Sequence, residues 1–128
     1  MAATLSSVKI KQGTTPIITA IVDEQAIQDA TVYFAIRARN RLIVKSNYHN
    51  TGDITLEPVY DETTAAQIGT SITVQLSQLE TLCLQPGAAR IEAGWVFDDG
   101  SADKSDIGML NITNTLLKGV MLYGKHSS

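Results

Sequence analysis

Hydrophobic and polar residues alternate along several stretches of the chain. This is the pattern of a β-strand with one face on a protein core and the other in water. Residues 71–76, Ser-Ile-Thr-Val-Gln-Leu, are apolar at every second position. The same alternation places Ile91, Ala93, Trp95 and Phe97 on one side of a second strand, with Arg90, Glu92, Gly94 and Val96 on the other. As the largest of these side chains, Trp95 is expected to anchor the core.

Six further segments have strand character, at residues 7–11, 17–22, 30–36, 42–44, 54–56 and 107–113. In the third of them, Val32, Phe34 and Ile36 share one face and are predicted to be core residues. The second follows Pro16 and has a mixed apolar pattern, which indicates a strand at a sheet edge, where a missing N–H is tolerated. Pro58 is expected to limit the fifth.

The last of these segments has an irregular pattern. Ile107 and Met109 share one parity along the chain, whereas Leu110 and Ile112 share the other. A β-bulge inserts one extra residue and so moves the following side chains to the opposite face. The change of parity therefore predicts a bulge near Met109.

Three short motifs predict connections between strands. Ser77 and Glu80 have the spacing of a capping box, in which each side chain accepts a hydrogen bond from the other residue's backbone N–H. Pro86-Gly87 supplies a fixed φ and then a residue free to adopt positive φ, which turns the chain into the next strand. Asp98-Asp99-Gly100 is typical of a hairpin.

The predicted fold is all-β: a single immunoglobulin-like antiparallel β-sandwich of about seven to eight strands, with one short helical turn near residues 77–81. Residues 1–128 are expected to form one domain, because a chain of 128 residues can bury about two thirds of the surface that its unfolded form exposes. Residues 1–6 and 124–128 are expected to be frayed at the ends of this domain.

The charge and hydropathy of the chain exclude some function classes. Ten Lys and Arg against thirteen Asp and Glu give a net charge of −3, whereas domains that bind nucleic acid through bulk electrostatics are usually strongly basic. The N-terminus has no basic segment followed by a long apolar run, and no stretch is long and apolar enough to span a membrane. We therefore expect a protein made in a cytoplasm, with no signal peptide and neither nucleic acid nor membrane as a partner.

One long segment resembles a known group of proteins. Residues 76–87 read Leu-Ser-x-x-Glu-Thr-Leu-x-Leu-x-Pro-Gly, and they precede an alternating strand, an acidic turn with glycine, and Ser-Asp-Ile before the last strand. In this order the motifs resemble tail and baseplate proteins of Gram-positive-type phages, especially the N-terminal β-sandwich domain of baseplate upper proteins and their prophage relatives. The resemblance is clearest over residues 71–120, where residues 116–120, Leu-Leu-Lys-Gly-Val, are similar to that group's strand-ending Leu-x-x-Gly-Val.

The resemblance implies a non-enzymatic structural protein of a phage virion, part of a tail, baseplate or neck, that acts through protein–protein docking. It implies synthesis in the bacterial host cytoplasm and assembly into the virion. The expected partners are copies of the chain itself, as a homo-oligomer in the assembled particle, and other virion proteins. The alternative is a β-sandwich module that binds a carbohydrate or another component of the host surface, with Tyr48, His49 and acidic loop residues as contacts.

Little in the sequence supports catalysis. His49 and His126 are the only histidines, and acid–base catalysis needs a base held within hydrogen-bonding reach of its proton. The chain contains no Gly-x-Ser-x-Gly elbow, no His-x-x-x-His pair and no glycine-rich phosphate loop. Cys83, the only cysteine, is interpreted as a small buried hydrophobe rather than a reactive thiol. We therefore expect no enzymatic activity, no catalytic residue and no cofactor.

Four aspartates, Asp98, Asp99, Asp103 and Asp106, are the best candidates for metal ligands, because Ca²⁺ is bound by several oxygen atoms from one loop. Their spacing does not match that of an EF-hand loop. Aspartates in a turn commonly accept hydrogen bonds from their own backbone. The turn is the favoured interpretation, and no metal is expected.

An arginine-rich hairpin is the first candidate for partner contacts. Arg37, Arg39 and Arg41 alternate around Asn40, the predicted tip of a turn between two strands. They can form a solvated edge that discourages unwanted strand pairing. They can also form an anion or subunit contact, because the planar guanidinium group suits carboxylates.

The C-terminal segment is the second candidate. It contains Leu116, Leu117, Met121 and Tyr123 and is more apolar than a monomer needs. It can dock on a neighbouring molecule or close the core of its own domain. For carbohydrate binding, which typically uses exposed aromatic rings, Tyr48, Tyr60 and Tyr123 are the available candidates.

Overall fold

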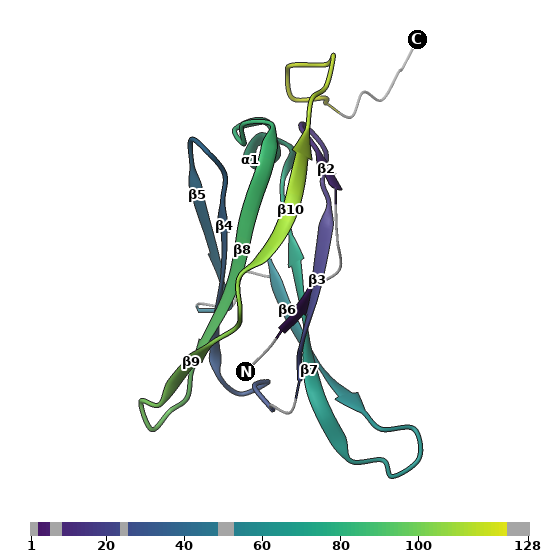
Figure 1. The fold of residues 1–128 in the computed structure, drawn as a ribbon, viewed down its shortest axis with the longest axis vertical. Coiled ribbons are helices and arrows are strands. Elements are labelled where there is room, and N and C mark those ends of the chain that lie inside the picture. Colours follow the sequence, from purple (N-terminus) through teal and green to yellow (C-terminus); the bar gives the residue numbers. More distant parts are fainter. Residues whose placement is uncertain (1–2, 6–8, 24–25, 49–52, 123–128) are drawn as a thin grey trace.

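The computed structural model describes residues 3–5, 9–23, 26–48 and 53–122, which form two facing β-sheets (Figure 1). In spatial order, the first sheet contains β1 (Ala3–Leu5), β3 (Ile17–Asp23), β7 (Gln67–Gln75) and β6 (Ile54–Tyr60). The second sheet contains β2 (Lys9–Lys11), β10 (Gly108–Thr113), β8 (Gly87–Val96), β4 (Thr31–Arg37) and β5 (Leu42–Ser46) in this order, and β9 (Ala102–Lys104) pairs with β8. One helix, α1 (Gln78–Leu82), completes the described elements.

This arrangement confirms the predicted immunoglobulin-like sandwich. The first sheet has the order of the A, B, E and D strands of immunoglobulin domains, and β10, β8 and β4 have the order of G, F and C. Among the described strands, all pairs are antiparallel except β2 with β10, which run parallel. β1 and β2 lie on different sheets. The described residues contain ten strands, and the two beyond the predicted number, β1 and β9, have three residues each.

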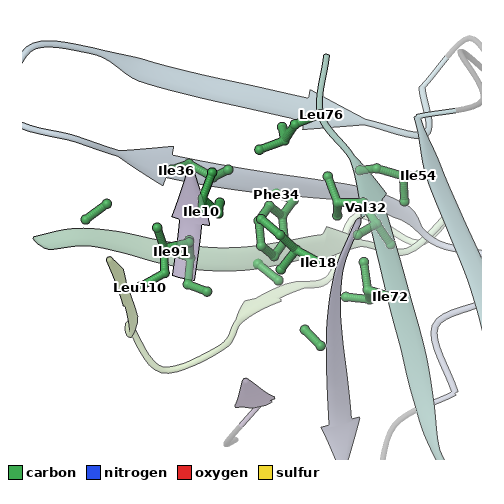
Figure 2. Packing of buried hydrophobic residues seen from close by; sticks show 14 of the residues in the cluster. Ile10, Ile18, Val32, Phe34, Ile36, Ile54, Ile72, Leu76, Ile91 and Leu110 are labelled. Atoms are coloured by element: carbon green, nitrogen blue, oxygen red, sulfur yellow. The ribbon is translucent and has the colours of Figure 1, made fainter. Parts of the chain in front are cut away.

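The core lies between the two sheets, where the inward residues of every long strand meet (Figure 2). Val32, Phe34 and Ile36 of β4 are fully buried, as predicted, and Trp95 of β8 is 1% exposed. Cross-strand register explains this, because Val32 lies opposite Trp95 and Ile36 opposite Ile91, so their side chains share the inner face. The alternating pattern therefore locates the core correctly.

Three predictions about individual strands are wrong. The strand after Pro16 is not an edge, since β3 lies between β1 and β7. β10 pairs with β8 without a change of register, so there is no bulge at Met109, which instead points outward like Ile107. β6 continues past Pro58 to Tyr60, because it is an edge strand that pairs only with β7.

The predicted turns are present. Ser77 and Glu80 form both hydrogen bonds of the capping box, with 3.2 Å from Glu80 N to Ser77 Oγ and 2.8 Å from Ser77 N to Glu80 Oε1. Gly87 has φ 126° after Pro86, and Gly100 has φ 86° in the turn between β8 and β9. The N-terminal strand β1 begins within the segment that the sequence analysis expects to fray, and residues 124–128 lie outside the described residues.

The β4–β5 hairpin is fixed to the segment that follows α1. Asn40 Nδ2 donates a hydrogen bond to the carbonyl oxygen of Cys83 at 3.0 Å, and the backbone N–H of Gln85 donates to Asn40 Oδ1 at 3.0 Å. The amide side chain thus uses its donor and its acceptor on the same partner segment. As a result, the arginine-bearing hairpin has a defined position at one end of the sandwich.

Candidate functional site

The outer faces of the two sheets differ in chemistry. On the first sheet, the outward positions of β3, β7 and β6 are mostly polar and include Thr19, Thr55, Glu57, Ser71, Thr73 and Gln75. The exposed large apolar side chains of these three strands are Ile17, Ile21, Tyr60 and Ile68. On the second sheet, six large apolar side chains are exposed: Tyr33, Leu42, Val44, Val96, Ile107 and Met109. We call these six residues the apolar face. A sheet face in water usually carries polar side chains, so this face is a candidate interaction surface.

Three shallow depressions run along the second sheet through the apolar face. The first, of about 220 Å³, lies between Tyr33 and Val96 over a floor that includes Ala35 and Gly94. The second, of about 180 Å³, lies between Leu42 and Ile107 and shares Ala35 and Glu92 with the first. Because neighbouring depressions share residues, a partner segment can contact them in succession.

Gly94 shows how the floor is kept open. A Cβ atom at this position would lie 3.6 Å from Lys104 Cγ and 3.7 Å from the carbonyl oxygen of Asp103, which are ordinary contact distances. The backbone conformation and packing therefore do not require glycine here. The absence of a side chain leaves space on the outer surface for a partner to approach the sheet.

The third depression, of about 200 Å³, is lined by Arg37, Arg39 and Arg90 together with Ala38 and Ala88. We call it the arginine depression. Arg37 and Arg90 are directly opposite each other on β4 and β8, and neither they nor Arg39 have an ion-pair or hydrogen-bond partner among the described residues.

The arginine cluster predicted from the sequence is confirmed in part. Arg37 and Arg39 line the depression, whereas Arg41 lies outside it, and Arg90, which is not among the predicted contact residues, completes the lining. Arg90 is far from the hairpin in sequence and joins it only through the pairing of β4 with β8. The alternation in its own strand places Arg90 on the outer face of the sheet. It does not show that Arg37 of β4 lies next to Arg90, because that depends on which strands pair.

The four candidate metal ligands are spread over the β8–β9 hairpin and the segment before β10. Asp99 Oδ1 accepts hydrogen bonds from Ser101 N at 2.8 Å and Ser101 Oγ at 2.6 Å, and these hydrogen bonds lower the pKa of Asp99. Asp98, Asp103 and Asp106 are exposed. Within the described ranges, no three His, Cys, Asp or Glu residues gather closely enough to hold a metal ion.

The C-terminal segment does not close the core. Leu116, Leu117, Val120, Met121 and Leu122 are all exposed, with Leu116 at 99%. Gln78 of α1 holds this segment from the side, donating from Nε2 to the Met121 carbonyl oxygen at 2.8 Å and accepting from Met121 N at 2.7 Å. The segment therefore presents apolar side chains to solvent. Its backbone lies beyond the end of β10 (Figure 1).

Other predicted site residues are placed as follows. His49, Tyr123 and His126 lie outside the described residues. Tyr48 and Tyr60 are exposed, as is Tyr33, which the sequence analysis did not count among the exposed aromatic residues although it occupies an outward position of β4. Cys83 is half-buried.

Lys45 forms both ion pairs found in the described part of the chain. Its Nζ lies 2.7 Å from Glu80 Oε2 and 3.1 Å from Asp53 Oδ2, at the edge where β5 approaches β6 and α1. Burial alone would lower the pKa of Lys45 and raise that of Glu80, but the hydrogen bonds and charges between them reverse both shifts. This cluster links β5, α1 and the residue before β6, which is a structural role.

Comparisons with known protein families and with curated proteins give no match to this chain. Within the ranges that the structure describes, no helix has the length and apolar character required to cross a membrane.

Proposed function

We propose that this chain is a non-enzymatic structural protein of a phage virion, part of a tail, baseplate or neck, that acts by docking to copies of itself and to other virion proteins. The observation that carries the docking role is the apolar face of the second sheet. The phage assignment rests on the resemblance of residues 76–87 and the strands that follow them.

The energetics of the apolar face support docking. Fully burying a Val, Leu, Ile or Met side chain contributes about 1.5–3 kcal/mol. Five of the six residues of the apolar face are Val, Leu, Ile or Met, and the sixth is Tyr33. All six side chains are more than a third exposed in the isolated chain. A partner that covers most of them gains enough to offset the loss of translational and rotational freedom on association, which costs at least about 4 kcal/mol.

The direct test is a double substitution, Val44→Lys with Ile107→Lys, in the apolar face. Both side chains are exposed, so the domain should still fold, while lysines in a docking interface lose their hydration. We expect the variant to remain monomeric in light scattering, under conditions in which the unchanged chain forms oligomers that electron microscopy can resolve.

The matched control is Ile17→Lys with Ile68→Lys, two exposed isoleucines of the first sheet. This variant carries the same change of charge and removes a similar set of exposed aliphatic side chains. If both variants assemble like the unchanged chain, the apolar face is not a docking surface.

The second candidate function is binding of a host-surface saccharide. It is favoured by Tyr33, whose exposed ring borders the first depression beside Glu92 and Asp103, since an aromatic ring and carboxylates are groups that hold sugars. A glycan array decides between the candidates: saturable binding that Tyr33→Ala abolishes would favour the binding module, and absence of binding by an assembling protein favours the structural role.

A further inference from the structure

Charged residues are divided between the two ends of the sandwich. One end holds the β4–β5 hairpin, α1 and the start of β8, and the opposite end holds the β6–β7 and β8–β9 hairpins (Figure 1). The first end carries Lys11, Arg37, Arg39, Arg41 and Arg90. The second carries Asp29, Asp61, Glu62, Asp98, Asp99 and Asp103, with Lys104 beside them. Near the basic end, the carboxylates of Glu80 and Asp53 are both paired with Lys45.

We propose that copies of this chain associate end to end, with the acidic β8–β9 hairpin of one copy seated in the arginine depression of the next. The proposal rests on the assembly function above and names the partner, a second copy of the chain, and the surfaces that meet.

The shapes and charges of the two surfaces are complementary. The arginine depression is a hollow of about 200 Å³ with three guanidinium groups that have no acceptor among the described residues. The β8–β9 hairpin is a narrow projection at the opposite end (Figure 1). Guanidinium groups bind carboxylates through paired hydrogen bonds, which gives such a contact geometric specificity as well as charge attraction.

Within the hairpin, the aspartates have different roles. Asp99 already accepts two hydrogen bonds from Ser101 and so holds the turn. Asp98 is exposed and has no partner among the described residues. Asp103 is exposed on the neighbouring strand β9, and only its Oδ1 accepts a hydrogen bond among the described residues, from Lys104 N at 2.8 Å. Asp98 and Asp103 therefore supply the carboxylates that meet the arginines.

The contact also continues into the apolar face. Arg37 and Arg90 line both the arginine depression and the second depression, which lies between Leu42 and Ile107. A hairpin docked on the arginines therefore lies next to exposed apolar side chains that can be covered as well. Because the two surfaces differ, each added copy leaves one hairpin and one depression unused, so association continues until a ring closes or a filament forms.

The test uses two charge-reversed variants of the full chain, Arg39→Glu with Arg90→Glu, and Asp98→Lys with Asp103→Lys. In each variant alone, the arginine depression and the β8–β9 hairpin carry net charges of the same sign and repel each other. In an equal mixture, the unchanged hairpin of the first variant meets the unchanged arginines of the second. We expect sedimentation velocity to show self-association at least about tenfold weaker for each variant alone, and complexes in the mixture.

Matched controls are Lys9→Glu with Lys118→Glu, and Glu57→Lys with Asp106→Lys, which change the net charge equally but lie outside the two surfaces. They should associate like the unchanged chain. Association of the unchanged chain should also weaken from low to high salt, because the Debye length falls from about 10 Å at 0.1 M to about 3 Å at 1 M.

Single substitutions keep the test decisive if a double variant does not fold. Arg39 is outside the strands and Asp98 has no partner to lose, so Arg39→Glu and Asp98→Lys can be mixed in the same way. A monomeric mixture, undiminished association of either variant alone, or binding of inorganic phosphate to the arginines without self-association overturns the proposal. In the first two of these cases, an assembly defect of the apolar-face variant would leave the proposed function standing.

Discussion

Two glycines that lie within paired strands differ in what they do for the molecule. At Gly69 in β7, an added Cβ would lie 2.6 Å from the carbonyl oxygen of Val22 in the neighbouring strand β3. At Gly94 in β8, it would make only ordinary contacts. Close approach of two backbones thus requires the first glycine, whereas the second keeps the outer surface open.

The two sites give opposite expectations for a change to alanine. Gly69→Ala forces β3 and β7 apart and should lower the free energy of unfolding by about 1–3 kcal/mol. Gly94→Ala should change it by no more than about 0.5 kcal/mol. Urea denaturation of both variants measures the difference. If both lose the same free energy of unfolding, close approach of β3 and β7 does not require glycine at position 69.

At the scale of elements, α1 is held by a charge cluster as well as by its cap. Glu80 accepts from the backbone of Ser77 at 2.8 Å and pairs with Lys45 on β5 at 2.7 Å, so one carboxylate serves the helix and joins it to the second sheet. Its pKa is lowered because these hydrogen bonds outweigh the opposing effect of burial.

The lowered pKa of Glu80 predicts a dependence of stability on pH. Its stabilising contribution is complete above the pKa of the unfolded chain, about 4.3, and is lost as the pH falls through the lower pKa of the folded chain. Glu80→Gln keeps an acceptor for the cap but removes the charge, and should cost about 1–2 kcal/mol at pH 7. Between pH 7 and 3, thermal unfolding of Glu80→Gln should therefore show a smaller loss of stability than thermal unfolding of the unchanged chain.

Glu57→Gln, at an exposed outward position of β6, is the control for this measurement. It should follow the unchanged chain over the whole pH range. If Glu80→Gln loses as much stability between pH 7 and 3 as the control does, the ion pair of Lys45 with Glu80 does not stabilise the fold.

Elements set by local chemistry were predictable, and those set by pairing were not. The capping box depends on two residues three positions apart, so sequence alone identified it. The partner of Glu80 on β5 and the meeting of Arg90 with Arg37 depend on which strands become neighbours, which spacing along the chain does not specify.

Two of the three wrong strand predictions, the edge at β3 and the bulge in β10, have a common cause. Strand faces were assigned on the assumption that the outward side is polar. Ile17 in β3 and Met109 in β10 are outward and apolar, so the first made a central strand look like an edge and the second imitated a bulge. Met109 belongs to the apolar face, whereas Ile17 lies on the first sheet, outside that face.

At the scale of the whole molecule, the sandwich separates two kinds of surface. The ends carry opposite charge, which in the proposed assembly sets the direction and register of an approaching copy. The side of the second sheet carries the apolar face, whose burial in the proposed assembly supplies most of the binding free energy. The core between the sheets is closed and gives this small domain the rigidity to hold both surfaces in place.

The most direct test of docking through the apolar face is hydroxyl-radical labelling of the unchanged protein, as monomers and as assembled particles. Met109 and Tyr33 are in the apolar face, whereas Tyr48 and Tyr60 are exposed outside it. We expect labelling of Met109 and Tyr33 to fall at least severalfold on assembly while Tyr48 and Tyr60 react as before. Assembled particles in which Met109 and Tyr33 are labelled as strongly as in monomers would contradict docking through this face.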